Sequence, residues 1–162
     1  MDVERWPAGQ REVVHHPGAC AVVATTPQGQ VVLVRQTREA IRSQLLEIPA
    51  GVFDVVGEDG ATCAARELVE ETGYRSGELQ PLATIYTSPG FTDERIELFL
   101  AHEVERGDGA GEVGVVVETP RFEDAVRAVR EGHIVDAKTI VGLLLAAEQM
   151  RRSGAREGAA GV

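Results

Sequence analysis

Apolar positions recur with a strand-like period through most of the chain and with a helical period near its end. Alternating or continuous apolar runs predict strands at 18–25, 31–36, 45–49, 79–86, 95–104 and 113–119. The turn signal Pro27-Gln28-Gly29 joins the first two runs and predicts a β-hairpin. Amphipathic helical patterns cover 123–131 and 136–152. This mixture predicts an α/β fold.

A further short helix, between the strands, carries a stripe of carboxylates and ends at Gly73. Glu67, Glu70 and Glu71 are spaced i, i+3 and i+4, which places them on one side of a helix. Arg66 precedes Glu70 by four residues and is positioned to pair with it. Glycine is the residue type that ends a helix in the left-handed conformation.

The two ends of the chain have weaker patterns. Residues 1–11 are expected to form an irregular lead or short edge strands around a turn at 7–9. The Gly/Ala-rich residues 153–162 are expected to be a disordered tail. The remaining 1–152 are predicted to form a single domain, since 162 residues with 43% hydrophobic content suffice for one core.

Charge and cysteine content narrow the class of protein. A formal net charge of −10 disfavours nucleic-acid partners, because such binding depends on many Lys/Arg–phosphate contacts. The acidic N-terminus without an apolar stretch predicts no signal peptide and a cytoplasmic protein that does not bind membranes. Cys20 and Cys63 are expected to be small buried apolar residues rather than ligands or a disulfide.

Two interpretations fit the carboxylate stripe. It is either a solvated acidic helix face or a site for a hard divalent cation, whose charge would relieve the repulsion among the glutamates. The surrounding residues favour the second interpretation, because they resemble the signature motif of the Nudix hydrolases. Seven residues separate Glu58 from Arg66, and six separate Gly51 from Glu58, one more than in the family pattern. The matching positions are Glu58, Arg66, Glu67, Leu68, Glu70, Glu71, Gly73 and Tyr74.

The Nudix resemblance extends over about 12–152 and implies an α/β/α sandwich with a mixed β-sheet. A loop at 88–95 places Pro89 sixteen residues after Gly73, a spacing that resembles the ADP-ribose pyrophosphatase subgroup. Segments that resemble that subgroup also occur at 34–38, 45–51, 88–95 and 136–144. The implied activity is metal-dependent hydrolysis of ADP-ribose to AMP and ribose 5-phosphate. The alternatives are another nucleoside diphosphate derivative or a non-catalytic nucleotide sensor.

The resemblance also assigns roles within the motif. Glu67, Glu70 and Glu71 are the implied ligands of Mg²⁺ or Mn²⁺, with the carbonyl of Ala50 as an additional ligand. Arg66 is expected to form a structural ion pair, and Glu58 is expected either to orient Arg66 or to support one of the metal ligands.

The catalytic base is expected in a loop near the end of the chain. Glu112, flanked by glycines, is the first candidate, and Asp108 and the motif glutamate Glu70 are alternatives. The subgroup also implies a homodimer that shares N-terminal strands.

Substrate-binding candidates lie outside the motif. Arg35 and Arg38 are expected to bind phosphate or stack on adenine, or simply to end a solvated strand. Glu94 resembles the position that binds the terminal ribose, near the turn formed by Pro89 and Gly90. Phe91 and Trp6 are aromatic candidates for stacking on the base, with simple packing as the alternative, whereas His15 and His16 are expected to be structural or surface residues.

Overall fold

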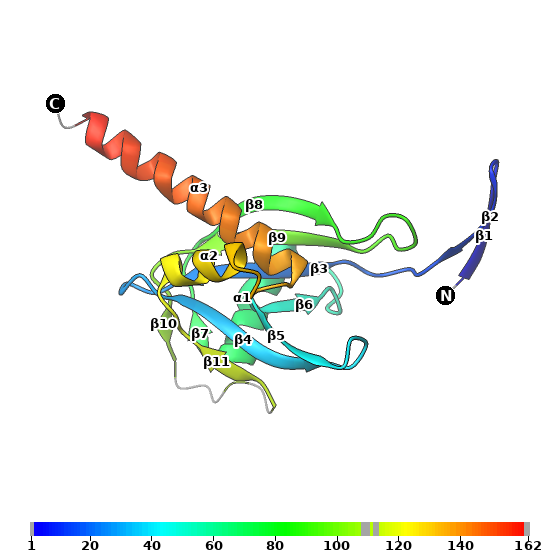
Figure 1. The fold of residues 1–162 in the computed structure, drawn as a ribbon, viewed down its shortest axis with the longest axis horizontal. Coiled ribbons are helices and arrows are strands. Elements are labelled where there is room, and N and C mark those ends of the chain that lie inside the picture. The colour runs from blue at the N-terminus through cyan, green and yellow to red at the C-terminus, as the bar shows by residue number, and fades with distance from the viewer. Residues whose placement is uncertain (1, 108–110, 112–113, 161–162) are drawn as a thin grey trace.

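A mixed seven-stranded sheet lies at the centre of the protein (Figure 1). The computed structural model describes residues 2–107, 111 and 114–160. Strands β3 and β9 pair in parallel, whereas the other neighbours are antiparallel, which confirms the predicted mixed sheet. In spatial order the strands are β11 (Val116–Glu118), β4 (Val31–Arg38), β3 (Ala19–Thr25), β9 (Arg95–Ala101) and β8 (Leu79–Tyr86), with β5 (Ser43–Glu47) beside β4 and β6 (Ala50–Val52) beside β3. A separate pair joins β7 (Tyr74–Arg75) to β10 (Glu105–Arg106).

Helices cover both faces of this sheet. One core contains Ala21 and Val23 of β3 with residues of α2 (Phe122–Arg130) and α3 (Ala137–Ala160). The alternating β3 residues Cys20, Val22 and Ala24 belong to a second core with α1 (Gly60–Thr72). Because successive strand side chains point to opposite faces, one strand contributes to both cores. The predicted α/β/α sandwich is confirmed.

Local signals define both ends of the acidic helix α1. The side chain of Asp59 accepts a hydrogen bond from the amide of Thr62 at 2.8 Å, which caps the first turn. At the other end Gly73 adopts φ 74°, and its amide bonds to the Val69 carbonyl at 2.9 Å. The predicted stop at Gly73 is confirmed, so the carboxylate stripe lies on the last two turns of α1.

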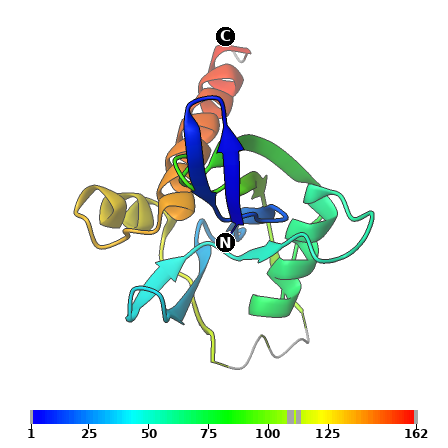
Figure 2. The same cartoon turned by 90° about the vertical axis from the view of Figure 1, so that its right-hand side faces the viewer.

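The N-terminal residues form a hairpin that projects from the body in Figure 1 and faces the viewer in Figure 2. Strands β1 (Asp2–Trp6) and β2 (Gly9–Val13) pair antiparallel. Of the two alternatives for this region, short strands around a turn are therefore confirmed, and an irregular lead is not. The hairpin is joined to the body by Val14, whose amide donates to the Phe91 carbonyl at 2.8 Å.

The C-terminal helix is longer than predicted. Helix α3 extends to Ala160, so residues 153–160, expected as a disordered tail, are helical in the structure. Figure 1 shows this end of α3 extending away from the sheet. No helix in the described part of the chain combines the length and apolarity needed to cross a membrane. The cytoplasmic location stays a prediction.

The two cysteines are bonded to each other, which corrects the expectation that they are unpaired. Both are fully buried, as predicted, and they form a disulfide between β3 and α1 across 43 residues of sequence. The sequence offered no spacing that indicated this pair. Sheet–helix packing brings their Cα atoms to 6.2 Å, within the range a disulfide spans.

Candidate active site

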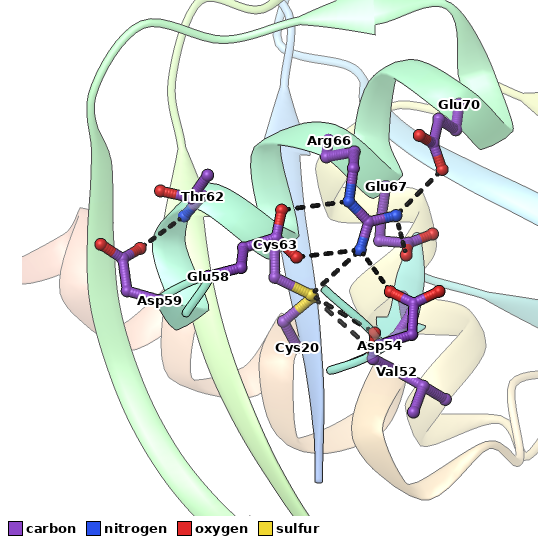
Figure 3. The surroundings of a disulfide bond; sticks show 12 residues. Cys20, Val52, Asp54, Glu58, Asp59, Thr62, Cys63, Arg66, Glu67 and Glu70 are labelled. Carbon is purple, nitrogen blue, oxygen red and sulfur yellow. Dashed lines mark hydrogen bonds and ion pairs between the residues drawn. A yellow bond between two sulfur atoms is a disulfide. The ribbon is translucent and has the colours of Figure 1, made fainter. Parts of the chain in front are cut away.

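Arg66 is the centre of the carboxylate cluster on α1 (Figure 3). Its Nε and Nη2 bind both oxygens of Glu58 at 3.1 and 3.0 Å. Its Nη1 donates to Glu67 at 2.6 Å and to Glu70 at 3.0 Å, and Nη2 also reaches Asp54 at 3.1 Å. One guanidinium thus organises four carboxylates from the loop and the helix. The predicted pairings of Arg66 with Glu70 and with Glu58 are confirmed, whereas Asp54 was not foreseen.

The electrostatics of the cluster follow from its partial burial. Burial raises the pKa of the Glu67 carboxyl, against the opposing charge and hydrogen bond of Arg66. The hydrogen bond to Glu58 is the main cause that raises the pKa of Arg66 above its usual value. One cation therefore faces an excess of carboxylates.

Gly51 brings backbone directly against this cluster. A Cβ at this position would lie 2.0 Å from Oε1 of Glu67, so any larger residue would collide with that carboxylate. The amide of the preceding Ala50 donates to Glu71 at 3.1 Å, and Glu71 is 6% exposed. The extra residue between Gly51 and Glu58 is accommodated in the loop, since Gly51 still contacts the helix.

The donor set fits a hard divalent cation. Glu67, Glu70 and Glu71 supply carboxylate oxygens from adjacent turns, and the missing Cβ of Gly51 leaves the backbone of β6 close to them. Among residues 2–107, 111 and 114–160, no three acidic, histidine or cysteine side chains already converge as a metal site. The reason is visible in the hydrogen bonds, because Glu67 and Glu70 are turned toward Arg66 and Glu71 toward Ala50.

The disulfide lies directly beneath this cluster (Figure 3). Sγ of Cys63 is 3.9 Å from Nη2 of Arg66, and Sγ of Cys20 is 3.6 Å from the Gly51 carbonyl oxygen. The disulfide therefore links α1, which carries the glutamates, to β3, the strand that pairs with β6.

A cavity of about 600 Å³ opens beside the same loop. Its walls include Ala50 and Gly51, which contact the α1 glutamates, and two of the predicted substrate residues, Arg38 and Glu94. The volume is in the range of small-molecule sites. The remaining lining residues are His16, Ala19, Ala40, Ile41, Leu45, Val52, Thr87, Ile96, Asp136, Ala137 and Lys138.

The other predicted substrate residues lie elsewhere. Arg35 pairs with Glu118 at 2.6 Å and lines neither this cavity nor the next. A second cavity, of about 340 Å³, is lined by Pro89, Gly90 and Phe91 together with Trp6.

The two proposed loop bases fall outside the described part of the chain. Glu112 and Asp108 both lie there, so their roles stay predictions.

Three charged residues near the first cavity were not predicted. Glu47 is fully buried, and Lys138 and Asp136 contribute to the cavity wall. Asp136 followed by Thr139 is a helix-capping signal, and Lys138 is the sole lysine in the sequence, but neither feature indicated a site. The pairing of Glu47 with Lys138 spans 91 residues and has no local signature.

Comparisons with known proteins show which family the chain resembles. Residues 14–149 match the NUDIX domain family. The ADP-ribose pyrophosphatase of Bacillus subtilis is 41% identical over 136 residues, covering 82% of this chain and 73% of that protein. The methanol dehydrogenase activator of Bacillus methanolicus is 39% identical over 150 residues, covering 88% and 80%.

A solved structure shares the fold. The structure titled "Crystal structure of ADP compounds hydrolase" superposes with a TM-score of 0.77 at 18% identity, covering 94% of this chain and 85% of that chain. The family match spans most of the chain, and the carboxylate cluster lies within the matched residues. The chain belongs to the Nudix family.

Proposed function

We propose that the protein hydrolyses the pyrophosphate bond of ADP-ribose to AMP and ribose 5-phosphate, with Mg²⁺ or Mn²⁺. The observation that carries this proposal is the contact between the α1 glutamates and the wall of the first cavity. Gly51 and Ala50 belong to that wall, and they touch Glu67 and Glu71. The similarity to the Bacillus subtilis ADP-ribose pyrophosphatase supports the choice of substrate.

Each group has a distinct role in this proposal. Glu67, Glu70 and Glu71 would hold the metal, with the Ala50 carbonyl as a further ligand. A divalent cation held by these groups would neutralise pyrophosphate charge and would lower the pKa of a bound water. Arg66 keeps the carboxylates in place, and Glu58 fixes Arg66 through both of its oxygens.

The substrate is held by groups of the cavity wall. Arg38 binds phosphate, and Glu94 accepts hydrogen bonds from the terminal ribose. In the structure Glu94 accepts a hydrogen bond from Thr87 at 2.6 Å, which fixes its carboxylate at the cavity. Water attacks a phosphorus, and the bridging P–O bond breaks with its electrons passing to the leaving phosphate oxygen. Glu112 is proposed as the base that takes the proton of the water.

We also propose a homodimer in solution, formed through the N-terminal hairpin. The hairpin projects from the body (Figure 1), and its residue Trp6 is 56% exposed. An exposed aromatic on a projecting strand pair is typical of a surface that packs against another chain. This supports a role for β1 and β2 in assembly.

The test of the proposed activity is AMP release from ADP-ribose by the purified protein with Mg²⁺ or with Mn²⁺. ADP-glucose, a dinucleotide and an oxidised dGTP serve as comparison substrates. We expect fast turnover of ADP-ribose that a chelator abolishes and that the double variant Glu70→Gln/Glu71→Gln lacks, because both changes remove metal ligands.

A matched control is Glu123→Gln, which removes an exposed carboxylate on α2 and is expected to retain full activity. If the protein prefers another nucleotide, the proposed metal-dependent hydrolysis stands but ADP-ribose is not its substrate. Binding of ADP-ribose without turnover of any substrate would favour a nucleotide sensor.

A further inference from the structure

A buried ion cluster forms part of the first cavity. Glu47, at the end of β5, has no exposed surface, and both of its carboxylate oxygens face cations. Arg38 binds them through Nε at 2.7 Å and Nη2 at 2.6 Å, and the ammonium of Lys138 binds Oε2 as well. A buried carboxylate needs such partners, because an unpaired charge is costly to remove from water.

The contacts within the cluster favour the charged forms of Glu47 and Arg38. Burial opposes the ionisation of Glu47, but the hydrogen bonds and charges of Arg38 and Lys138 outweigh it and leave the pKa of Glu47 below its usual value. The hydrogen bond from Arg38 to Glu47 likewise raises the pKa of Arg38. The charges of Asp136 and of Glu71 on α1 raise the pKa of Arg38 as well.

The first turn of α3 holds Lys138 in place. Its ammonium donates to Asp136 at 3.1 Å, and the same Asp136 oxygen accepts from the amide and hydroxyl of Thr139 at 3.0 and 2.6 Å. The hydroxyl oxygen of Thr139 in turn accepts from the Ile48 amide at 2.9 Å, next to Glu47. The cluster is therefore fixed from both β5 and α3, and the residue Lys138 is 8% exposed.

Both cations keep donors that Glu47 does not use. Arg38 binds Glu47 through Nε and Nη2, whereas its Nη1 makes no hydrogen bond to the residues that the structure describes. The Arg38 side chain is 43% exposed and lines the cavity, as Lys138 does. A guanidinium fixed along one edge and open along another matches the bidentate geometry of phosphate oxygens.

We propose that Glu47 and Lys138 are positioning residues for the substrate pyrophosphate. Glu47 holds the guanidinium of Arg38 with one edge left for a phosphate, and Lys138 holds Glu47 and adds its positive charge beside it. Arg38 and Lys138 line the same cavity as the backbone of Ala50 and Gly51, which contacts the α1 glutamates, so one pyrophosphate bound there reaches both the cations and the glutamate cluster. This inference rests on the proposed function, because it requires a pyrophosphate-containing substrate.

The test compares Glu47→Gln, Lys138→Met and Lys138→Arg in the full chain. Glu47→Gln and Lys138→Met are each expected to raise KM for ADP-ribose about tenfold with kcat changed less than about threefold, the pattern of lost ground-state binding. Lys138→Arg retains the charge and is expected to restore KM to within about threefold of the unsubstituted protein. Glu148→Gln is the matched control, since it removes a carboxylate that two arginines bind on the exposed face of α3, and it is expected to leave KM unchanged.

A second readout uses inorganic pyrophosphate as the probe, with binding measured by calorimetry at one fixed Mg²⁺ concentration. Binding is expected to weaken about tenfold in Glu47→Gln and Lys138→Met, and to be restored in Lys138→Arg. A purely structural cluster would leave KM and pyrophosphate affinity unchanged in variants that still fold, even where the urea midpoint of unfolding falls. That result overturns the proposal.

The two proposals fail in distinguishable ways. If the unsubstituted protein turns over ADP-ribose and the variants retain its KM, the positioning role is wrong and the proposed function stands. If ADP-ribose is not cleaved while pyrophosphate binding depends on Glu47 and Lys138, the positioning role stands and the substrate is wrong. Should Glu47→Gln fail to fold, Lys138→Met and Lys138→Arg provide the same comparison.

Discussion

Single residues of this protein act through very short contacts with the acidic helix. Gly51 is the clearest case, because the Glu67 carboxylate occupies the space in which a Cβ of residue 51 would lie. Its φ does not lie in the left-handed region, so the requirement for glycine comes from close approach alone. Glu47 shows the complementary situation, since a fully buried charge depends on two cations from other elements.

The substitution Gly51→Ala is expected to lower kcat/KM by about 100-fold, because a displaced carboxylate no longer has the productive geometry. Steady-state kinetics with ADP-ribose and Mg²⁺ measure this. Gly77→Ala is the control, because a Cβ there meets nothing within 4 Å. Full activity of Gly51→Ala would show that Glu67 does not need its present position.

The substitution Glu47→Gln is expected to destabilise the fold by about 3 kcal/mol at pH 7, since it leaves two cations without their buried partner. Because folding lowers the pKa of Glu47, its stabilisation is present above the usual value of 4.5 and is lost as the pH falls through the lowered pKa. The difference between the two proteins should therefore shrink toward pH 3. Urea unfolding at pH 7 and near pH 3 measures it, and a difference independent of pH would contradict this origin.

At the scale of elements, α1 is held by its caps and by a covalent link. The Asp59 side chain caps the start of the helix and Gly73 caps its end, and the Cys20–Cys63 disulfide joins the helix to the central strand β3. Since the same strand pairs with β6, the disulfide also connects the helix to the segment of Ala50 and Gly51. The relative position of the glutamates and the β6 backbone is thereby constrained.

Replacing both cysteines by alanine is expected to lower the free energy of unfolding by about 2–4 kcal/mol under oxidising conditions, because a link across 43 residues restricts the unfolded chain. Urea unfolding with and without a thiol reductant measures the effect. The reductant should destabilise the unsubstituted protein and leave the double variant unchanged. An unsubstituted protein with the same urea midpoint in both conditions would contradict a stabilising disulfide.

At the scale of the whole molecule, one part stands apart from the sandwich. The hairpin β1–β2 contacts the body through Val14 and through His15, whose Nδ1 lies 2.7 Å from Asp93 and whose Nε2 lies 2.8 Å from Glu4. The hydrogen bond with Asp93 raises the pKa of His15. A two-stranded hairpin alone has marginal stability in water. Packing against the surface of a second chain would supply the stability that β1 and β2 need to stay ordered.

The full chain is expected to have the mass of a dimer, about twice 17.4 kDa, and a chain lacking residues 1–13 the mass of a monomer. Light scattering after size-exclusion chromatography measures both masses. A monomeric full chain would contradict the proposed dimer, and a truncated chain that stays dimeric would place the interface elsewhere.

Local patterns in the sequence were enough to predict the main strands and helices and the carboxylate stripe of the acidic helix. The period of apolar residues predicted β8 at its observed bounds and the hairpin of β3 and β4, because both depend on neighbours along the chain. The spacing of Glu67, Glu70 and Glu71 and the stop at Gly73 were likewise local, since helix geometry relates residues three and four apart.

Contacts between residues far apart in the sequence could not be predicted in this way. The Cys20–Cys63 bond, the ion pair of Glu47 with Lys138 and the contact of Gly51 with Glu67 join segments that no local pattern relates. Each depends on the register of the strands and on how α1 and α3 pack against the sheet. Local periodicity reports which face a side chain occupies, whereas its partner on that face is set by the packing of whole elements.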